Sequence, residues 1–143
     1  MKDQATSNAP AGAPFRLRPL WLIVGWALVV LVIYLSLAPI SVDIAPVQHG
    51  DKLEHALAYA VLMAWFACLY AARPVRLGYA LGFIALGIVL EFLQRETGYR
   101  NFELLDMAAD AVGVALGWAL APPRMPNYLS LIDNIFFGTR RSS

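Results

Sequence analysis

The chain has 143 residues, of which 59% are hydrophobic and 15% are charged, and its formal net charge is +1. Soluble domains are about 45–50% apolar and about 25% charged, so the composition excludes an ordinary soluble domain. The near-balance of charge gives no indication of nucleic-acid binding, and the length leaves no room for a soluble catalytic domain beside a membrane bundle. The single cysteine, Cys68, excludes an internal disulfide and is interpreted as a small buried hydrophobic residue.

Residues 1–18 are predicted to form a disordered cytoplasmic tail, since the first fourteen carry almost no large apolar side chains. From Pro19 to Val42 the chain has no charged residue, a run long enough to cross a hydrocarbon core about 30 Å thick. We expect a spanning helix that is retained, not a cleaved signal peptide. Pro39 should end it, because proline disfavours helix at the residue before it.

Three further apolar segments predict three more spanning helices, at about residues 52–72, 77–94 and 104–121. A basic turn at Arg73–Arg76 separates the second span from the third, and two prolines stop the fourth. The predicted fold class is therefore all-α, an integral membrane bundle of four transmembrane helices over residues 19–121. Residues 122–143 are predicted to be a cytoplasmic tail, in which Tyr128 to Phe137 forms a short amphipathic element along the interface.

Basic residues are unevenly divided between the two sides of this bundle. With the N-terminus inside, most of them would be cytoplasmic: Lys2, Arg16, Arg18, Arg73, Arg76, Arg124, Arg140 and Arg141. Only Lys52, Arg95 and Arg100 would lie outside. Because positive charge favours the inner side, we expect a multi-pass protein of the bacterial cytoplasmic membrane with both termini in the cytoplasm.

Polar residues gather at the outer side, where the second and fourth spans begin and the third ends. The candidates are Asp51, Lys52, His55, Tyr59, Glu91, Gln94, Arg100, Asp106 and Asp110, in a stretch that also contains Glu103. Within each helix they recur at three- or four-residue spacing, which puts them on one face. Ionisable groups at membrane depth are costly, so they predict a functional site.

Small residues continue the acidic face of the fourth span. Gly113 and Gly117 follow Asp110 on that face, and small residues at every fourth position let helices approach closely in lipid. We therefore expect the acidic face to point into the bundle. Gly78 and Gly82 are expected to play the same part on the third span.

These motifs, in this order, resemble the pattern of VanZ-like membrane proteins. The matching residues are Asp51-Lys-x-x-His55-x-x-x-Tyr59, Glu91-x-x-Gln94, Arg100 and Asp106-x-x-x-Asp110-x-x-Gly113-x-x-x-Gly117. The resemblance covers about residues 35–117, although the family usually has Asn where this chain has Asp110. It implies a small integral membrane protein linked to the cell envelope, whose namesake is associated with tolerance of the glycopeptide teicoplanin. It implies no settled biochemical activity.

Residues at the start of the second span have structural as well as functional interpretations. Asp51, with Glu54 three residues later, is interpreted as a helix cap, and Lys52 as an interfacial anchor that snorkels to the headgroups. His55 is either a general acid or base near neutral pH or a histidine merely hydrogen-bonded in the bundle. Tyr59 is expected to pack with its hydroxyl satisfied by a neighbour.

The third and fourth spans supply the other candidates. Glu91 is expected to pair with Arg100, either as a static salt bridge or as part of a site in which Arg100 and Lys52 accept a phosphate or carboxylate. Asp106, nearer the water, is expected to be more important for function than Asp110. Carboxylates and His55 are legitimate metal ligands, yet the basic residues beside them would repel a cation, so no metal and no cofactor are predicted.

Three functions remain open from the sequence. The first is a protein that binds an envelope amphiphile: a lipid headgroup, a lipid-linked precursor or a lipoglycopeptide. The second is a membrane-embedded hydrolase or transferase with His55, Glu91 and Asp106 as candidate catalytic residues. The third is a structural assembly partner. Predicted partners are membrane lipids, one such amphiphile and, through the face carrying Gly113 and Gly117, a second copy of the chain; no nucleic acid is expected.

Overall fold

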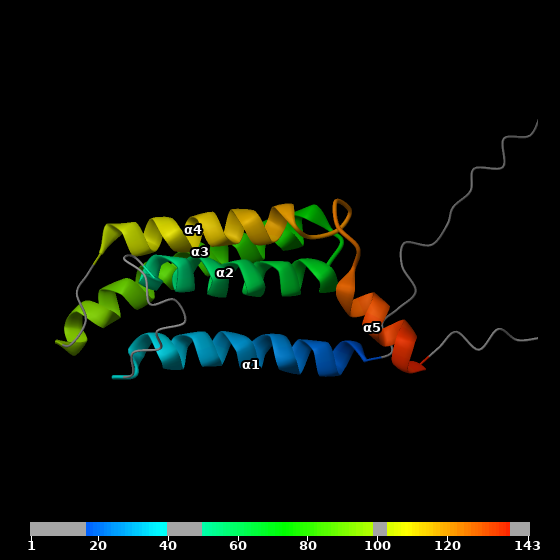
Figure 1. Cartoon of the computed structure of the whole chain (residues 1–143), viewed down its shortest axis with the longest axis horizontal. Coiled ribbons are helices and arrows are strands. Elements are labelled where there is room, and N and C mark those ends of the chain that lie inside the picture. The colour runs from blue at the N-terminus through cyan, green and yellow to red at the C-terminus, as the bar shows by residue number, and fades with distance from the viewer. Residues whose placement is uncertain (1–16, 40–49, 99–102, 138–143) are drawn as a thin grey trace, which may run out of the picture.

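The computed structural model describes residues 17–39, 50–98 and 103–137. They form five helices: α1 (Arg18–Leu37), α2 (Gly50–Leu69), α3 (Arg73–Thr97), α4 (Leu104–Ala119) and α5 (Tyr128–Phe137), shown in Figure 1. These residues contain no β-strand, which confirms the all-α fold class. The predicted N-terminal tail lies outside the described residues, apart from its last two positions.

Three of the helices, α1, α2 and α3, are long and apolar enough to cross a membrane. The fourth predicted span corresponds to α4, which has 16 residues and carries both Asp106 and Asp110. At 1.5 Å per residue it extends about 24 Å, somewhat less than the roughly 30 Å hydrocarbon core. The structure thus supports the predicted membrane protein with three candidate spans among the described residues, not four.

Proline and glycine set the helix ends. A proline lies in the first turn of both α1 and α3, where its missing N–H leaves no hydrogen bond unmade. As expected from Pro39, α1 ends at Leu37. The C-terminal end of α3 is capped by Gly98, whose φ of 75° lies in the left-handed region that favours glycine.

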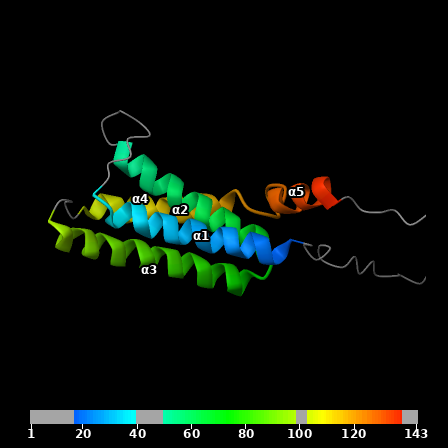
Figure 2. The ribbon, with the colours of Figure 1, turned by 90° about the horizontal axis from the view of Figure 1, so that it is seen from below.

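The central contact of the bundle is between α2 and α4, which lie side by side in Figures 1 and 2. A Cβ atom added at Gly113 would collide with the carbonyl of Ala56, and one added at Gly117 with the carbonyl of Ala60. The two backbones are therefore in direct contact. The prediction that small residues turn the acidic face of α4 inward is confirmed, since Asp110 is only 3% exposed.

The corresponding prediction for α3 is wrong. Added Cβ atoms at Gly78 and Gly82 would meet nothing within 4 Å. These glycines instead line an apolar hollow between α3 and α1, walled by Trp26 and Phe83. The close contact of α3 uses Gly87, where an added Cβ would overlap the carboxylate of Asp110.

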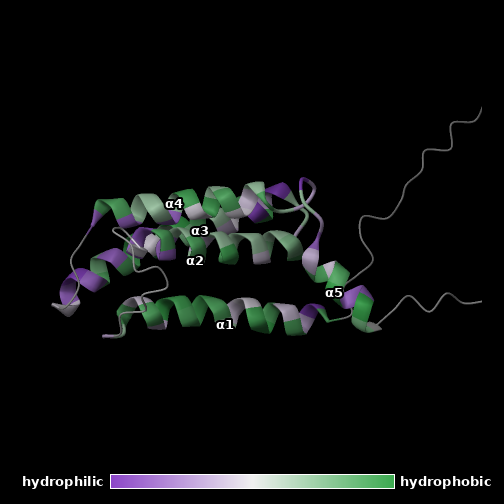
Figure 3. Cartoon of the chain, in the orientation of Figure 1, coloured by the Kyte–Doolittle hydropathy of each residue, from purple (hydrophilic) through white to green (hydrophobic). Residues whose placement is uncertain are grey.

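The core is built from α2 and its neighbours around Phe66 and Tyr79, whose rings stack at 4.5 Å between centroids. Large apolar side chains are exposed on the outside, including Ile23 and Val30 on α1 and Leu57 on α2. Figure 3 shows that hydrophobic residues predominate along the middle of α1, α2 and α4. Exposed apolar surface on this scale marks contact with a membrane or a partner.

The C-terminal element is a helix, as predicted, and it lies across the end of the bundle where α2 ends and α1 begins (Figure 1). On α5, Leu129 packs against Cys68 and Leu69, so Cys68 is buried as expected. Asp133 accepts a hydrogen bond from the backbone N–H of Leu17 at 3.1 Å, at the position that precedes α1. A carboxylate there complements the positive end of the α1 dipole.

Candidate functional site

A polar cluster occupies the end of the bundle where α2 begins, α3 ends and α4 begins (Figures 1 and 3). We call it the polar end cluster; its described members are Asp51, Lys52, His55, Glu91, Gln94, Glu103, Asp106 and Asp110. Buried members come from both α3 and α4. The predicted convergence of these three helix ends is thus present, and most of the predicted site residues lie together.

Lys52 is the hub of the outermost layer. Its Nζ lies 2.9 Å from Asp51 Oδ2, 2.6 Å from Glu103 Oε2 and 3.0 Å from Asp106 Oδ1. These contacts match the three N–H donors of an ammonium group. Lys52 was predicted to be an interfacial anchor that snorkels to the headgroups; in the structure its charge is turned toward three carboxylates, two of which link α2 to the start of α4.

The cap predicted at Asp51 is also absent. Because α2 begins at Gly50, Asp51 lies within the first turn of the helix. Its carboxylate is engaged by the neighbouring Lys52 side chain. A shift of one or two residues at a helix terminus changes a cap into a first-turn side chain, and this is the least predictable feature of a helix.

One helical turn deeper, His55 pairs with Asp110. The distance from His55 Nδ1 to Asp110 Oδ1 is 2.9 Å. The other carboxylate oxygen of Asp110 faces the backbone of α3 at Gly87, where only glycine leaves room for it. A carboxylate that holds Nδ1 fixes the ring and leaves Nε2 as the free nitrogen, an arrangement found in catalytic and metal-binding histidines.

Glu91 and Gln94 tie α3 to its neighbours. Glu91 is 1% exposed, and its Oε1 accepts a 2.6 Å hydrogen bond from the backbone N–H of Glu103 at the start of α4. Gln94 Nε2 donates to the carbonyl oxygen of Ser36 at 2.9 Å and so connects α3 to the last turn of α1. Arg100, the predicted partner of Glu91, lies outside the described residues.

Tyr59 lies deeper still and is 2% exposed. We expected a neighbour to satisfy its hydroxyl, but among the described residues the hydroxyl has no hydrogen-bond partner. It is within electrostatic reach of Asp110 and Glu91. A buried hydroxyl without a partner costs about 1–3 kcal/mol, and such groups in native proteins call for an explanation, often a functional one.

The cluster is strongly acidic. Its described residues include five carboxylates, those of Asp51, Glu91, Glu103, Asp106 and Asp110, against Lys52 and the titratable His55. Three of the five, those of Asp51, Glu103 and Asp106, have oxygens within 4.8 Å of one another, close enough to hold a metal ion. Lys52 Nζ already contacts all three, so the lysine supplies the cation at that point.

Two participants were not among the sequence-derived candidates. Glu103 contacts both Lys52 and, through its backbone, Glu91. The position of Glu103 in an acidic stretch was a sequence signal for the site. Glu103 precedes the first residue of α4, however, so the three- or four-residue spacing within helices does not identify it. Gly87 gives no sequence signal, because its role depends on where Asp110 packs.

No protein-family model matches the chain, and neither a curated protein nor a solved structure matches it.

Proposed function

We propose that the chain is a four-span protein of the bacterial cytoplasmic membrane, with both termini in the cytoplasm and the polar end cluster on the outer side. α4 begins beside the start of α2, where Lys52 contacts Asp106. After α4 ends, the chain lies beside the α2–α3 turn, where Arg76 donates to the carbonyl of Pro122. α4 thus extends between the same two ends of the bundle as α2, and α2 is a candidate membrane span. The basic residues Arg73, Arg76 and Arg124 share one end, which the positive-inside rule assigns to the cytoplasm.

The function we propose is binding the polar headgroup of an envelope amphiphile. The candidates are a lipid, a lipid-linked precursor or a lipoglycopeptide, and the resemblance to VanZ-like proteins supports a role in the envelope. The observation that carries the proposal is the excess of carboxylates over cations among the described residues of a cluster at the end of apolar helices. Groups held in this way at membrane depth are costly and are retained for function.

The chemistry of the cluster favours a ligand with an amine. Lys52 is already matched by three carboxylates, so it offers no free donor for an anion. An ammonium group from a ligand would find the same oxygens that now hold Lys52 Nζ. Charge-assisted bonds of this type are roughly twice as strong as neutral ones. In this arrangement Asp51, Glu103 and Asp106 bind the amine of the headgroup.

The test compares binding of an amine-bearing amphiphile to single variants. Purified protein in neutral detergent is titrated with phosphatidylethanolamine or with teicoplanin, and ligand retention is measured by native mass spectrometry. Asp106→Asn and Glu103→Gln each remove one carboxylate that contacts Lys52 and should weaken binding about tenfold, since a hydrogen bond to a charged group contributes about 1.5–3 kcal/mol. Glu96→Gln, on the exposed last turn of α3, is the matched control and should bind like wild type.

The same variants separate binding from a purely structural role. If both cluster variants retain the amphiphile and only melt at lower temperature, the carboxylates form a clamp between helices. The protein would then be a membrane assembly partner and not a binding protein. Weaker retention at unchanged melting temperature supports the binding function.

A second candidate function is a membrane-embedded hydrolase or transferase acting on a lipid-linked substrate. The 2.9 Å contact between His55 and Asp110 favours it, because the carboxylate orients the ring and leaves Nε2 free as a general base. Turnover of a labelled lipid-linked substrate should then fall by about 10²–10⁴-fold in His55→Ala. Turnover that is unchanged in this variant would remove His55 from any mechanism.

A further inference from the structure

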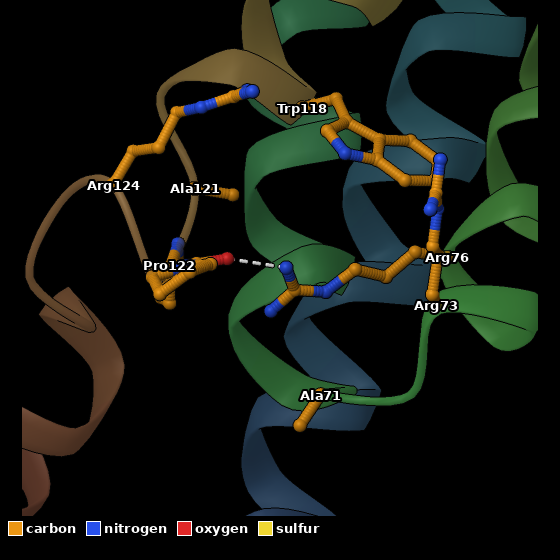
Figure 4. A pocket seen from close by; sticks show the side chains of 8 residues that line it. Ala71, Arg73, Arg76, Trp118, Ala121, Pro122 and Arg124 are labelled. Carbon is orange, nitrogen blue, oxygen red and sulfur yellow. Dashed lines mark hydrogen bonds between the residues drawn. The ribbon is translucent and has the colours of Figure 1, made fainter.

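A basic cavity lies at the end of the bundle opposite the polar end cluster, where α2 ends and α3 begins (Figure 4). Its volume is about 390 Å³, within the range of about 300–1,000 Å³ that is typical of small-molecule sites. Three of the described residues that line it are the arginines Arg73, Arg76 and Arg124, and none of the described lining residues is acidic. The cavity thus brings Arg124, which follows α4, beside Arg73 and Arg76 in the first turn of α3.

Arg76 forms the fixed wall of this cavity. It is 8% exposed, and its guanidinium donates to the carbonyl oxygens of Tyr70 at 2.6 Å, Ala67 at 2.7 Å and Pro122. Neutral carbonyls orient the group without cancelling its charge. A guanidinium has five N–H donors, so two remain after these three bonds.

Arg73 and Arg124 are exposed, and their side chains border the same hollow in Figure 4. All the ion pairs that the structure describes lie in the polar end cluster. Within the described part of the chain, none of the arginines around the cavity forms an ion pair with a carboxylate. Like charges gathered without counter-charges raise the local concentration of anions.

The remaining walls suit a ligand that is anionic at one end and apolar at the other. Trp118 lines the cavity beside Ala121 and Pro122, and an indole ring offers one N–H donor together with a large apolar face. Further along the chain, α5 exposes Ile135 and Phe136, side chains suited to a membrane interface. Basic pockets between spanning helices on the cytoplasmic side are suited to the headgroups of anionic lipids.

We propose that this cavity binds a phosphate group, with Arg73 and Arg124 closing on an anion that Arg76 anchors from below. Arginine presents paired N–H groups that match phosphate oxygens in a bidentate manner. The phosphate belongs either to the headgroup of an anionic membrane lipid or to a soluble phosphate compound. The site is independent of the amphiphile proposed for the polar end cluster, since it lies at the other end of the helices.

The test uses the full chain in neutral detergent and three single variants. Wild type, Arg73→Gln and Arg124→Gln are titrated with phosphatidylglycerol in one arm and with glycerol 3-phosphate in the other. Binding is measured as ligand-dependent thermal stabilisation and as ligand retained in native mass spectra. Arg95→Gln is the matched control, because Arg95 is an exposed arginine of α3 at the opposite end and its replacement removes the same charge.

Each cavity variant should bind about tenfold more weakly, as expected for the loss of one charged hydrogen-bonding partner, and the control should bind like wild type. Both replaced arginines are exposed, so the melting temperature without ligand should stay unchanged. An unchanged melting temperature shows that weaker binding is not caused by misfolding. Binding of phosphatidylglycerol alone assigns the site to lipid, and binding of glycerol 3-phosphate assigns it to a soluble phosphate. Equal loss in Arg95→Gln, or no saturable binding in either arm, overturns the proposal.

Discussion

Replacing Gly113 with alanine tests the contact on which the whole site depends, that of α4 with α2. The added Cβ would lie 2.9 Å from the carbonyl carbon of Ala56 and 3.0 Å from its Cα, and closer still to its oxygen. Carbon atoms are at their optimal separation at about 3.5–4.0 Å, so the helices must move apart by about 0.5–1 Å. Overpacking of this kind costs about 1–3 kcal/mol.

The matched control is Gly78→Ala, where the new methyl group meets nothing within 4 Å. Alanine favours helix over glycine by about 0.8–1.0 kcal/mol, and this gain applies at both positions. The difference between the two variants therefore isolates the overpacking cost of about 1–3 kcal/mol. Gly113→Ala should be the less stable of the two by that amount.

The assay is reversible unfolding of the purified protein in mixed micelles with increasing dodecyl sulfate, followed by tryptophan fluorescence. Separation of α2 and α4 would also move Asp51 away from Glu103 and Asp106, whose oxygens now lie within 4.8 Å of one another. Amphiphile binding should therefore weaken in Gly113→Ala and not in Gly78→Ala. Equal free energies of unfolding for the two variants would refute the close approach of the helices.

Three other predictions concern charged side chains that are buried or partly buried. Lys52→Met leaves its three carboxylates without their cation, so the free energy of unfolding at neutral pH should fall by about 1–2 kcal/mol and recover on addition of Ca²⁺. If Ca²⁺ does not stabilise the variant, this prediction is contradicted. Arg76→Met leaves three carbonyl groups without their donor and should lower the free energy of unfolding by at least about 2 kcal/mol. Arg73→Met, at an exposed position, should change it little. Equal effects of the two variants would contradict the hydrogen bonds described for Arg76. Asp133→Ala should lower the free energy of unfolding by about 1 kcal/mol through loss of the hydrogen bond at the start of α1, whereas Asn134→Ala, at an exposed position, should not. If Asp133→Ala leaves stability unchanged, Asp133 does not stabilise the start of α1.

Much of the fold follows from the sequence because the signals are local. A charge-free run and Pro39 define α1, and the amphipathic stretch from Tyr128 to Phe137 coincides with α5. The inward direction of the acidic face of α4 also follows, because Gly113 and Gly117 lie in the same row as the carboxylates. In each case the deciding residues lie within one helix or directly beside its end.

The pairings within the site were not predictable in the same way. The sequence predicts that Lys52 is an anchor at the lipid headgroups, and its contacts with carboxylates depend on the placement of Glu103 and Asp106. Gly78 and Gly82 carry the same spacing as the glycines of α4, yet they face a hollow because α1 does not approach them closely. Spacing identifies the face of a helix that permits contact, and tertiary packing decides whether a neighbour uses it.

The bonds of Lys52 have a further consequence for any cationic ligand. The lysine is tethered beside the oxygens that such a ligand would use, so it acts as an intramolecular competitor. A group on a short flexible tether has an effective concentration in the millimolar range. A simple amine would therefore be displaced by the protein's own side chain, and only a ligand whose apolar part adds binding energy from the membrane would occupy the site. If the polar end cluster binds an amphiphile as proposed, Lys52 would favour that ligand over free cations, which gain no binding energy from the membrane.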